Sequence, residues 1–381
     1  MSVGHLPTTE TAVDTDAADR ETGRFAYIPP NWFAAVMGTG IIAIGAHGLA
    51  WQNSLLRGLA LAFWLLACVL YVLVVAATAA HWISYPDTAR AHLRHPVIAH
   101  FYGAVPMATL TVGTSTLLVG APLIGHAAAV GIDLVLFGVG TLGGVITAIT
   151  IPLLHLVGRR ESRGDAFGGW LMSVVPPTVS ASGAAILAGE LASSAAQTVV
   201  LTIGYAMLAL SLVLSLPIIV AIVARLVTSG VGAAGFVPTW WIVLGPLGQS
   251  ITAACLLGRT AGDPTLIRFG VDYGVAVWFV ALCWIGIAAA ITAHTVANGM
   301  PFALTWWSFT FPVGTFVTGT NALAVAEDST PLAVIAVVAF AALLIAWTVV
   351  AVRTRCRGAR RTATGGTCLT WPVTHGPDPQ P

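Results

Sequence analysis

The stretch PFALTWWSFTFPVGTF, residues 301–316, contains two tryptophans, four phenylalanines and two prolines, but no charged residue. A proline inside a helix removes a backbone hydrogen bond, so proline within an apolar run predicts a kinked or broken helix. In a bilayer such a break is tolerated only where protein or a water-filled cavity satisfies the freed backbone groups. The stretch therefore predicts a broken membrane helix that borders an internal path.

The composition of the whole chain also indicates a membrane protein. Of its 381 residues, 57% are hydrophobic and only 8% are charged, whereas about 25% of residues are charged in ordinary soluble proteins. The net charge is +1, and this argues against a nucleic-acid partner, which calls for a clustered basic face. The chain therefore needs the lipid bilayer as its main solvent.

The cysteines predict neither a metal site nor a disulfide framework. They form no CxxC pair, and no histidine lies near them at metal-ligand spacing. Three of the five fall in apolar segments, where a free thiol packs as a small hydrophobic group. We therefore expect no metal and no cofactor. The five are Cys68, Cys255, Cys283, Cys356 and Cys368.

Ten apolar runs are long enough to cross a membrane, since a spanning helix needs about 20 apolar residues. They predict an all-α membrane domain over residues 31–352. Residues 1–30 are polar and lack the apolar core of a signal peptide, and residues 353–381 are arginine-rich, so both are expected to be disordered cytoplasmic tails. The ten runs are 31–50, 58–80, 96–120, 126–156, 168–190, 196–224, 238–258, 271–295, 301–326 and 331–352.

The arginines predict the orientation of these spans. With the N-terminus in the cytoplasm, thirteen arginines fall on the cytoplasmic side and three on the other side, which is a strong positive-inside bias. We therefore predict a multi-pass protein of the plasma (inner) membrane with both termini in the cytoplasm. The cytoplasmic set is Arg20, Arg24, Arg90, Arg94, Arg159, Arg160, Arg163, Arg225, Arg353, Arg355, Arg357, Arg360 and Arg361, and the opposite set is Arg57, Arg259 and Arg268.

The odd-numbered spans differ from the even-numbered ones. Short connections pair consecutive spans into five helical hairpins, and the first member of each hairpin carries glycine or proline in its middle together with many hydroxyl side chains. For any one residue, close helix packing explains glycine, serine and threonine equally well. Breaks at every second span predict five kinked helices around a central pore, with five outer helices facing lipid. The predicted breaks and pore-lining residues are Gly38, Thr39, Gly40, Pro106, Pro176, Pro177, Gly245, Pro246, Pro312 and Gly314.

The predicted pore has almost no fixed charge. Asp133 is the only acid well inside an apolar run, and it lies near one end of the fourth span, on an outer helix. His100 and His294 also lie near span ends. Interfacial packing explains all three, although ionisable groups within membranes are often functional. Because His100 lies on an inner helix before Pro106, we predict that any pH dependence of transport acts through His100.

Several strings resemble the tellurite-resistance/dicarboxylate transporter family, which includes malate permeases, sulfite pumps and plant slow-type anion channels. The resemblance covers about residues 28–352, and the MGTG and WWSFTFP strings are its most specific parts. It implies a homotrimer whose protomers each have ten helices, arranged as five hairpins around an anion pore. The strings are PPNWFAAVMGTGI (29–41), HPVIAHFYGAVPMATLTVG (95–113), WLMSVVPPTVSASG (170–183), GPLGQS (245–250, which adds Gln249 to the predicted pore residues) and PFALTWWSFTFPVGTF (301–316).

The resemblance also implies a pore gate, because a phenylalanine on the ninth helix closes the pore in channel members of the family. Phe311 matches that position best, and Phe309 second. We place Trp306 and Trp307 near the cytoplasmic interface, where tryptophan commonly anchors a helix. Helix packing would also explain these aromatic residues.

These observations predict transport of small anions, with dicarboxylates such as malate as the first expectation. Sulfite or tellurite efflux and passive conduction are the alternatives within that class, and a proton-coupled symporter remains open beside a channel. The chain lacks the long regulatory termini of the plant channels, and its MGTG and GPLGQS strings are closer to the permeases. No HExxH motif, GxSxG motif or paired intramembrane carboxylates indicate an enzyme. A structural or receptor-like membrane protein would not require five broken helices.

Overall fold

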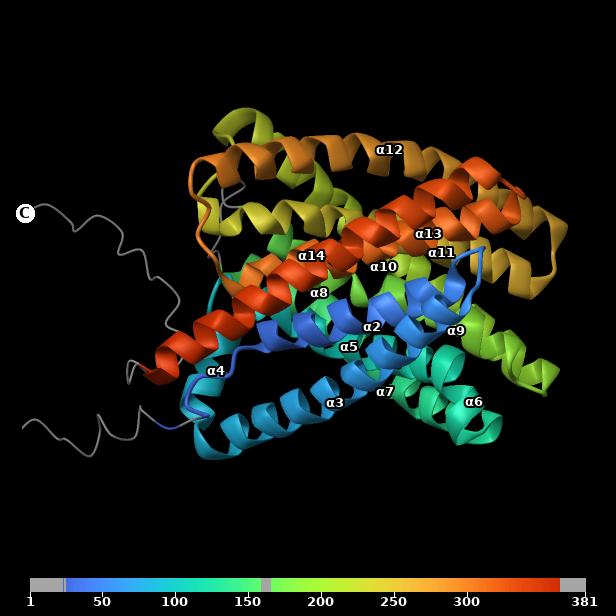
Figure 1. Cartoon of the computed structure of the whole chain (residues 1–381), viewed down its shortest axis with the longest axis horizontal. Coiled ribbons are helices and arrows are strands. Elements are labelled where there is room, and N and C mark those ends of the chain that lie inside the picture. The colour runs from blue at the N-terminus through green and yellow to red at the C-terminus, as the bar shows by residue number, and fades with distance from the viewer. Residues whose placement is uncertain (1–22, 24, 159–165, 364–381) are drawn as a thin grey trace, which may run out of the picture.

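The computed structural model describes residues 23, 25–158 and 166–363, which form helices joined by short turns (Figure 1). Shorter helices lie between the long ones: α4 (Pro86–Arg94), α6 (Ala121–Ile124), α8 (Leu171–Val174), the 3-10 helices η1 (Pro30–Trp32), η2 (Ala99–Gly103), η5 (Gly168–Trp170), η6 (Ala234–Val243) and η7 (Leu304–Phe309), and the π-helix η3 (Thr116–Gly120). The main helices are α2 (Phe33–Gly48), α3 (Ser54–Ser84), α5 (Ala104–Ser115), α7 (His126–Gly158), α9 (Pro176–Gly189), α10 (Ser194–Ser229), α11 (Leu244–Ala261), α12 (Pro264–Ala297), α13 (Phe311–Ala326) and α14 (Thr330–Ala363).

The length of the helices makes the chain a multi-pass α-helical membrane protein. Seven helical segments of the described residues are long and apolar enough to cross a membrane, and α8 with α9, which meet at an angle of 47°, make an eighth. The α-helical parts of α2 and α13 have only 16 residues each. Because a span needs about 20 residues, these two are short of that length without the 3-10 turns that precede them.

Consecutive long helices pack against each other in pairs. The pairs are α2 with α3, α5 with α7, α9 with α10, α11 with α12, and α13 with α14. Side chains cap the start of three second members: Asn53 accepts a hydrogen bond from the Leu56 N–H before α3, Ser193 from Ala196 before α10, and Asp263 from Leu266 before α12. Such caps satisfy backbone donors that have no partner in the first turn.

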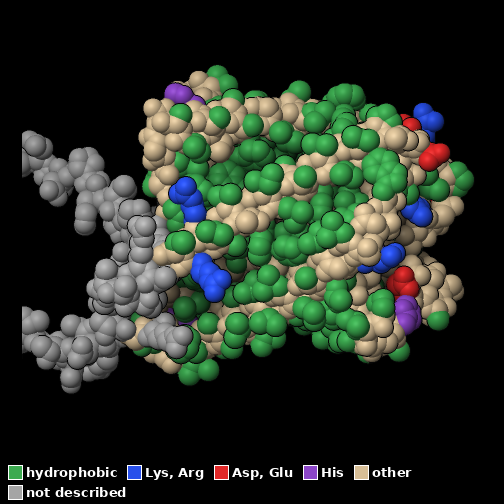
Figure 2. Space-filling view, viewed as in Figure 1, with side chains coloured by type: hydrophobic (Ala, Val, Ile, Leu, Met, Phe, Trp, Pro, Cys, Tyr) green, Lys and Arg blue, Asp and Glu red, His purple; other side chains and the backbone are tan. Residues whose placement is uncertain are grey.

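The first members of these pairs form a closed ring. Helix α2 contacts α5, α5 contacts α9, α9 contacts α11, α11 contacts α13, and α13 returns to α2. Nearly all their side chains are buried, whereas α3, α7, α10, α12 and α14 expose apolar residues such as Leu73, Val139, Leu216, Phe279 and Val338. The space-filling view accordingly shows a face covered with hydrophobic side chains, and its charged groups gather toward the two ends (Figure 2). Lipid is the solvent that such a surface fits.

The prolines do not lie where the sequence suggested. Pro176 and Pro177 begin α9, Pro312 is the second residue of α13, and Pro106 and Pro246 are the third residues of α5 and α11. Each therefore lies in the first turn of an α-helix that follows a 3-10 segment or a short helix, and not in the middle of a long helix. Proline is tolerated there because its missing N–H would have no partner in the first turn.

Helix α2 departs further from the expectation. Gly38, Thr39 and Gly40 lie within one unbroken α-helix, Phe33–Gly48. Glycine thus does not interrupt this helix, and its effect is on packing. A Cβ at Gly40 would lie 2.7 Å from Cγ2 of Thr111, so the glycine lets α2 approach α5 closely.

Three segments outside the predicted apolar runs carry structure that hydropathy did not indicate. Helix α4 is a polar, amphipathic helix between α3 and η2, so it was absent from a search for apolar runs. Helix α14 continues to Ala363, past the predicted boundary at residue 352. The backbone carbonyl of Phe25, from the predicted N-terminal tail, lies 2.8 Å from Nδ1 of the buried His81. Residues 1–22, 24 and 364–381, which make up the rest of both tails, lie outside the described residues.

Candidate functional site

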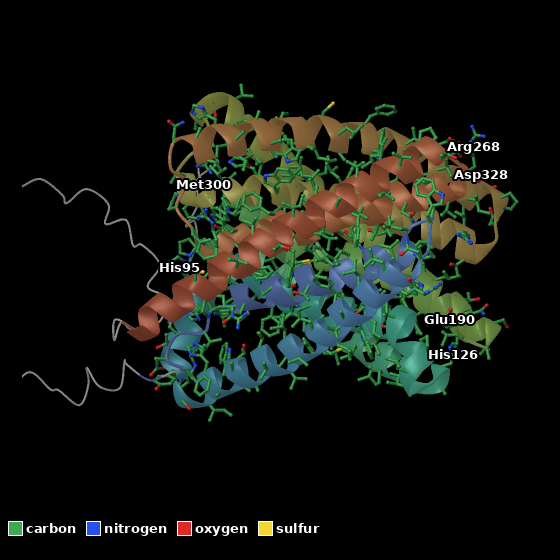
Figure 3. All side chains as sticks on the ribbon, viewed as in Figure 1. His95, His126, Glu190, Arg268, Met300 and Asp328 are labelled. Atoms are coloured by element: carbon green, nitrogen blue, oxygen red, sulfur yellow. The ribbon has the colours of Figure 1, made fainter. Side chains whose placement is uncertain are left out.

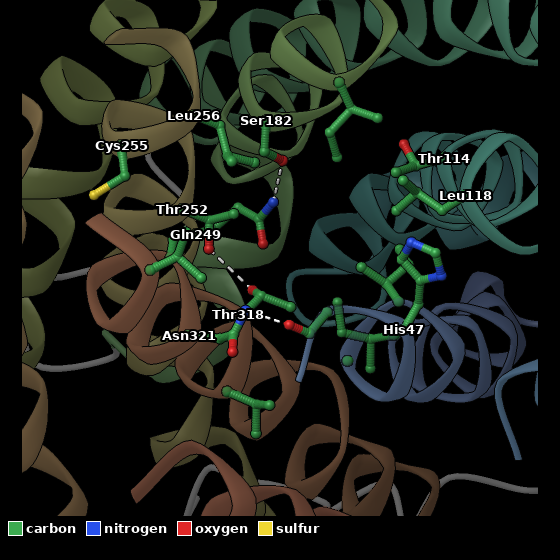
Figure 4. Close-up of a pocket in the computed structure, with 18 of the residues that line it drawn as sticks. His47, Thr114, Leu118, Ser182, Gln249, Thr252, Cys255, Leu256, Thr318 and Asn321 are labelled. Atoms are coloured by element: carbon green, nitrogen blue, oxygen red, sulfur yellow. Dashed lines mark hydrogen bonds between the residues drawn. The ribbon is translucent and has the colours of Figure 1, made fainter. Parts of the chain in front are cut away.

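The ring of five helices encloses a cavity of about 740 Å³. Each of the five contributes to its wall, and Figure 4 labels residues from all of them, such as His47, Thr114, Ser182, Gln249 and Thr318. Helix α12 adds Ile267 and Val271. The wall is largely aliphatic, with a minority of hydroxyl and amide side chains. Its polar and aromatic residues are His47, Thr111, Thr114, Ser182, Gln249, Thr252, Arg259, Phe311, Thr318 and Asn321.

Phe311 closes one end of this cavity. Its side chain is 2% exposed and also borders a much smaller hollow on the other side, together with Met37, Gly245 and Pro312. Phe311 is the first residue of α13, and the preceding Thr310 ends the 3-10 segment η7. The change from 3-10 to α-helix at this point therefore positions the phenyl ring between the two spaces.

From Phe311 the cavity follows α13 toward the C-terminus of that helix. Its last lining residue there is Ala326, fifteen residues beyond Phe311, which corresponds to about 22 Å along an α-helix. On α11 the cavity extends in the same direction, from Gln249 to Arg259. It leads toward the end of the molecule where Figure 3 shows Arg268 and Asp328, and away from the end with His95 and Met300.

Hydrogen bonds link the polar side chains of the wall between helices. Gln249 Nε2 of α11 donates to Ser182 Oγ of α9, and Thr252 Oγ1 of α11 lies 2.9 Å from Thr318 Oγ1 of α13. Ser182 Oγ in turn donates to the Val179 carbonyl at 3.0 Å. This arrangement leaves Gln249 Oε1 buried and without a hydrogen-bond partner among the described residues. A buried amide oxygen without a partner is costly unless a ligand or water reaches it.

The open end of the cavity carries its fixed charge. Arg259, in the last turn of α11, is the only arginine among the lining residues. Asn321 Nδ2 donates to the Gly48 carbonyl at 2.6 Å, and this bond joins α13 to the end of α2 beside His47. The charge of Arg259 attracts anions to the opening, while the walls below it are neutral.

The dipoles of the ring helices add to this field near Phe311. Helices α9 and α13 begin at Pro176 and Phe311, so their N-terminal ends lie at the closed end of the cavity. A helix N-terminus carries a partial positive charge and favours a nearby anion. An anion in the cavity thus meets the partial positive charges of helix N-termini at the closed end and the full positive charge of Arg259 at the opening.

Only some of the predicted pore residues line the cavity. Gln249 and Phe311 do, while Gly245 and Pro312 border the small hollow behind Phe311. Thr39 faces outward, because its Oγ1 donates to the Ala35 carbonyl and accepts from Trp347 Nε1 of α14.

The remaining predicted residues serve helix packing. Gly38 packs on Thr310, and a Cβ at Gly314 would lie 2.5 Å from Cγ1 of Ile41. Pro106 and Pro176 face the glycines Gly143 and Gly144 of α7. Packing is the role that small residues commonly have between membrane helices. Pro177 and Pro246 are buried in the first turns of α9 and α11, outside the cavity wall.

Phe309 lies in a different place from Phe311, although only two residues separate them. Its ring contacts Trp241 and Trp306, with ring centroids 5.9 and 5.7 Å away. These three residues border a second, strongly apolar hollow of about 490 Å³ between α12 and α14. Phe309 therefore has no part in the wall of the central cavity.

His100 also lies outside the cavity. It is buried in η2, where its ring stacks on Trp170 at 6.0 Å and meets Phe167 edge-on at 6.2 Å. The cavity begins on the following helix at Thr111, eleven residues further along the chain. The structure thus places the predicted pH-sensing residue among aromatic side chains at the far side of Phe311.

Several wall residues were not singled out from the sequence. Asn321 of α13 and His47 of α2 are examples, while Ser182 and Thr318 had counted only among the hydroxyl residues of the inner helices. The spacing of the wall residues on α11 is a signal that could have indicated the lining face. These residues recur at helical intervals, as residues on one face of a helix do; they are Gln249, Thr252, Cys255, Leu256 and Arg259. On a helix buried on all sides, however, hydropathy does not distinguish that face from the others.

Comparisons with known proteins agree on one kind of protein. Residues 27–355 match the model of a protein family described as SLAC1, voltage-dependent anion channel. An uncharacterized transporter of Methanocaldococcus jannaschii is 24% identical over 293 residues, which is 77% of this chain and 82% of that protein. A sulfite efflux pump of Trichophyton rubrum is 25% identical over 306 residues, covering 77% of this chain and 80% of the pump. A sulfite efflux pump of Arthroderma benhamiae is 24% identical over the same length.

Proposed function

The chain belongs to the SLAC1 family of voltage-dependent anion channels, and we propose that it carries small anions through the cavity enclosed by α2, α5, α9, α11 and α13. Membership confirms the resemblance predicted from the MGTG and WWSFTFP strings. It makes the protein a membrane transporter or channel and not an enzyme. The observation that best supports this path is the position of Phe311 at the inner end of a cavity whose opening carries Arg259.

Sulfite is the substrate that we propose first. Relatives that align with 77% of the chain are named sulfite efflux pumps, and this favours sulfite over the dicarboxylates expected from the sequence. Malate remains the second candidate, because a cavity of about 740 Å³ has room for a four-carbon dicarboxylate. Tellurite has only the family resemblance in its support.

We propose that Phe311 is the gate of this path. Its ring separates the cavity from the small hollow that Leu304 and Ser308 of η7 also line. Phe309, the second candidate, packs against tryptophans outside the path. A small change in the start of α13 would move the ring of Phe311, since that residue is the first of the helix.

We also propose ten membrane spans with both termini in the cytoplasm of a plasma membrane. The two short ring helices would cross together with their 3-10 segments, α2 with η1 and α13 with η7. The thirteen-to-three distribution of arginines supports the orientation. A homotrimer, in which each protomer has its own path, rests on the family resemblance alone.

Transport by purified protein in proteoliposomes tests this function. Vesicles are loaded with buffer, and uptake of radiolabelled sulfite and of radiolabelled malate is compared with uptake by protein-free vesicles. We expect sulfite uptake above that of the protein-free vesicles. At equal concentration, malate uptake should be slower than sulfite uptake. Faster malate uptake would reverse the order of substrates, and uptake of neither anion would refute the proposed function.

A further inference from the structure

Asp133 is the one acidic side chain that is buried in the described part of the chain. It is 2% exposed and lies in the second turn of α7, about 10 Å from the helix start at His126. Helix α7 is one of the segments able to span the membrane. The carboxyl group therefore belongs to a helix able to span the membrane, and an acidic residue in such a helix marks a candidate functional site.

The surroundings of Asp133 are built around its carboxyl group. Its Oδ1 lies against Gly113 of α5, where an added Cβ would come within 2.6 Å, so a larger residue at this position would require the carboxyl group to shift. Its Oδ2 is buried and has no hydrogen-bond partner among the described residues. Leu136 forms the other side of this contact. The site thus accepts the carboxyl group without supplying the hydrogen bonds that a carboxylate needs.

No cation faces Asp133 to compensate a negative charge. The elements packed against α7 are α5, α6, α8, α9, η2 and η3, and among their described residues only His100 and Tyr102, both of η2, can titrate. His100 stacks on Trp170 at the other end of α5, thirteen residues before Gly113. His126, the first residue of α7, is paired with Glu190 at the exposed end of the helix, with their atoms 3.7 Å apart. The neutral, protonated carboxyl group is therefore the form that this site stabilises.

Only one helix separates Asp133 from the central cavity. Gly113 and Leu110 of α5 face α7, whereas Thr111 and Thr114 of the same helix line the cavity. Thr111 donates a hydrogen bond to the Met107 carbonyl at 2.7 Å, whereas among the described residues no such bond ties Thr114, the residue next to Gly113, to the carbonyl of the preceding turn. Thr114 Oγ1 would also lie 3.3 Å from a Cβ on Gly183 of α9. A hydroxyl group at this position can rotate between the cavity and the interior of the helix pair.

The backbone beside this position departs from α-helical geometry. Helix α5 ends at Ser115 and continues as the π-helix η3, Thr116–Gly120. A π-helical turn has a wider hydrogen-bonding pattern than an α-helix and frequently occurs at functional sites. Because η3 begins only two residues after Thr114, a small backbone change there would connect the carboxyl group to cavity water.

We propose that Asp133 is a proton-binding site coupled to the central cavity, so that one proton crosses the membrane with the transported anion. The carboxyl group binds a proton from cavity water on one side of the membrane and holds it while water is excluded from the site. It releases the proton to cavity water on the other side of the membrane. No bond other than the O–H bond of the carboxyl group is made or broken. This inference rests on the proposed anion transport and adds the coupled ion.

Infrared spectroscopy of the purified protein in lipid tests the protonation directly. A protonated carboxyl group gives a carbonyl band that is separate from carboxylate bands and shifts in deuterated water. We expect this band at neutral pH in the wild type and its loss in Asp133→Asn. Glu190→Gln, which changes an exposed acid at the end of the same region, is the matched control and should keep the band. A wild type without the band would refute the proposal.

Coupled transport is tested with a pH-sensitive dye inside proteoliposomes while chloride, nitrate and sulfite are offered in turn. Chloride and nitrate carry no proton of their own at neutral pH. We expect the wild type to acidify the lumen with any anion that it imports, and Asp133→Asn to import the same anion with at least tenfold less acidification. Unchanged acidification in Asp133→Asn would overturn the proposal while leaving anion transport intact.

The stability of the variant provides a further criterion. If Asp133 is neutral in the folded protein, asparagine replaces it without loss of charge, and the melting temperature of Asp133→Asn should be equal to or above that of the wild type. A markedly lower melting temperature would indicate a charged, paired carboxylate and would refute the proposal. If the wild type imports no anion at all, the proposed function fails, and the infrared band still decides whether Asp133 binds a proton.

Discussion

Gln249 Nε2 donates a hydrogen bond to Ser182 Oγ, and this bond ties α11 to α9 across the wall of the central cavity. The amide oxygen of Gln249 then has no partner among the described residues, although the side chain is 5% exposed. An amide group held at one end and unpaired at the other is suited to bind a ligand in the cavity. It can present its oxygen, or present its N–H groups if the amide rotates, because one hydroxyl group can either accept or donate.

Gln249→Leu should therefore weaken anion binding. The substitution removes the amide group but keeps a side chain of similar volume, and we expect KM for sulfite to rise at least tenfold, since one hydrogen bond to a charged group is worth about 1.5–3 kcal/mol. Uptake kinetics in proteoliposomes measure this. Leu256→Met, an apolar change in the same wall, is the control. An unchanged KM in Gln249→Leu would show that the amide group does not meet the substrate.

Phe311→Ala should increase the anion current several-fold, because the ring that closes the inner end of the cavity is removed. Phe309→Ala is the matched control: the same change two residues away, in a side chain that packs on Trp241 and Trp306. Currents are recorded in planar bilayers or in oocytes. If Phe309→Ala opens the path and Phe311→Ala does not, the assignment of the gate is wrong.

Arg259→Gln should slow anion entry without changing the preference for anions over cations. Arg259 lies at the cavity opening, where a fixed charge raises the local anion concentration, while selection below it depends on neutral groups and helix N-termini. Arg268→Gln is the control, because Arg268 is exposed, pairs with Asp272 at 2.9 Å and does not line the cavity. Reversal potentials measure selectivity, and cation preference in Arg259→Gln would contradict this account.

Gly314→Val should destabilise the protein by about 1–3 kcal/mol, the usual cost of forcing extra atoms into a packed core. A Cβ at this position would lie 2.5 Å from Cγ1 of Ile41, where α13 meets α2. Gly138→Ala is the control, since nothing lies within 4 Å of a Cβ there, and alanine is the better helix former. Melting temperatures in detergent measure the destabilisation by each variant. An equal decrease in both variants would mean that the α2–α13 contact is loosely packed.

The stability of the protein should fall as the pH decreases from about 6.5 to about 4. Burial, followed by the charges of His81 and His95, lowers the pKa of His92 from 6.5 to about 4 in the folded protein. The unfolded chain thus binds a proton at His92 before the folded protein does, and the stability present above pH 6.5 is lost across this interval. Melting temperatures as a function of pH measure the effect.

His92→Gln should flatten this dependence, whereas His126→Gln, at an exposed histidine, should leave it unchanged. His92 stacks with His81 at 5.3 Å and meets Tyr27 edge-on at 4.9 Å, so it holds the segment before η1 against α3 and α4. A pH dependence that persists in His92→Gln would assign it to other groups.

The position of Phe311 could be predicted from the sequence, and that of Thr39 could not. The resemblance of the WWSFTFP string placed Phe311 in the path, and Phe311 does line the cavity as the first residue of α13. Thr39 lies on a helix buried on all sides, so nothing local indicates that its hydroxyl group faces Trp347 of α14 and not the cavity. Hydropathy gives the length of a span but not its rotation, because rotation depends on contacts with helices distant in the chain.

The surroundings of Asp133 also could not be predicted from hydropathy. Its position on an outer helix near a span end suggested an interfacial group, whereas the contact with Gly113 places it behind the cavity wall. The polar helix α4 was missed because only apolar runs were sought. The family resemblance, by contrast, depended on strings such as MGTG, which remain recognisable whichever way their side chains point.

The closure of the ring between α2 and α13 sets the order of events during synthesis. Gly38 packs on Thr310, a residue 272 positions later in the chain. At about 5–20 residues per second, the ribosome reaches Thr310 roughly half a minute after Gly38 has been made. Throughout that interval α2 has one neighbour of the ring, α5, and an open flank. A nascent chain therefore contains no continuous conduit, and the membrane is not made permeable until the final hairpin leaves the translocon.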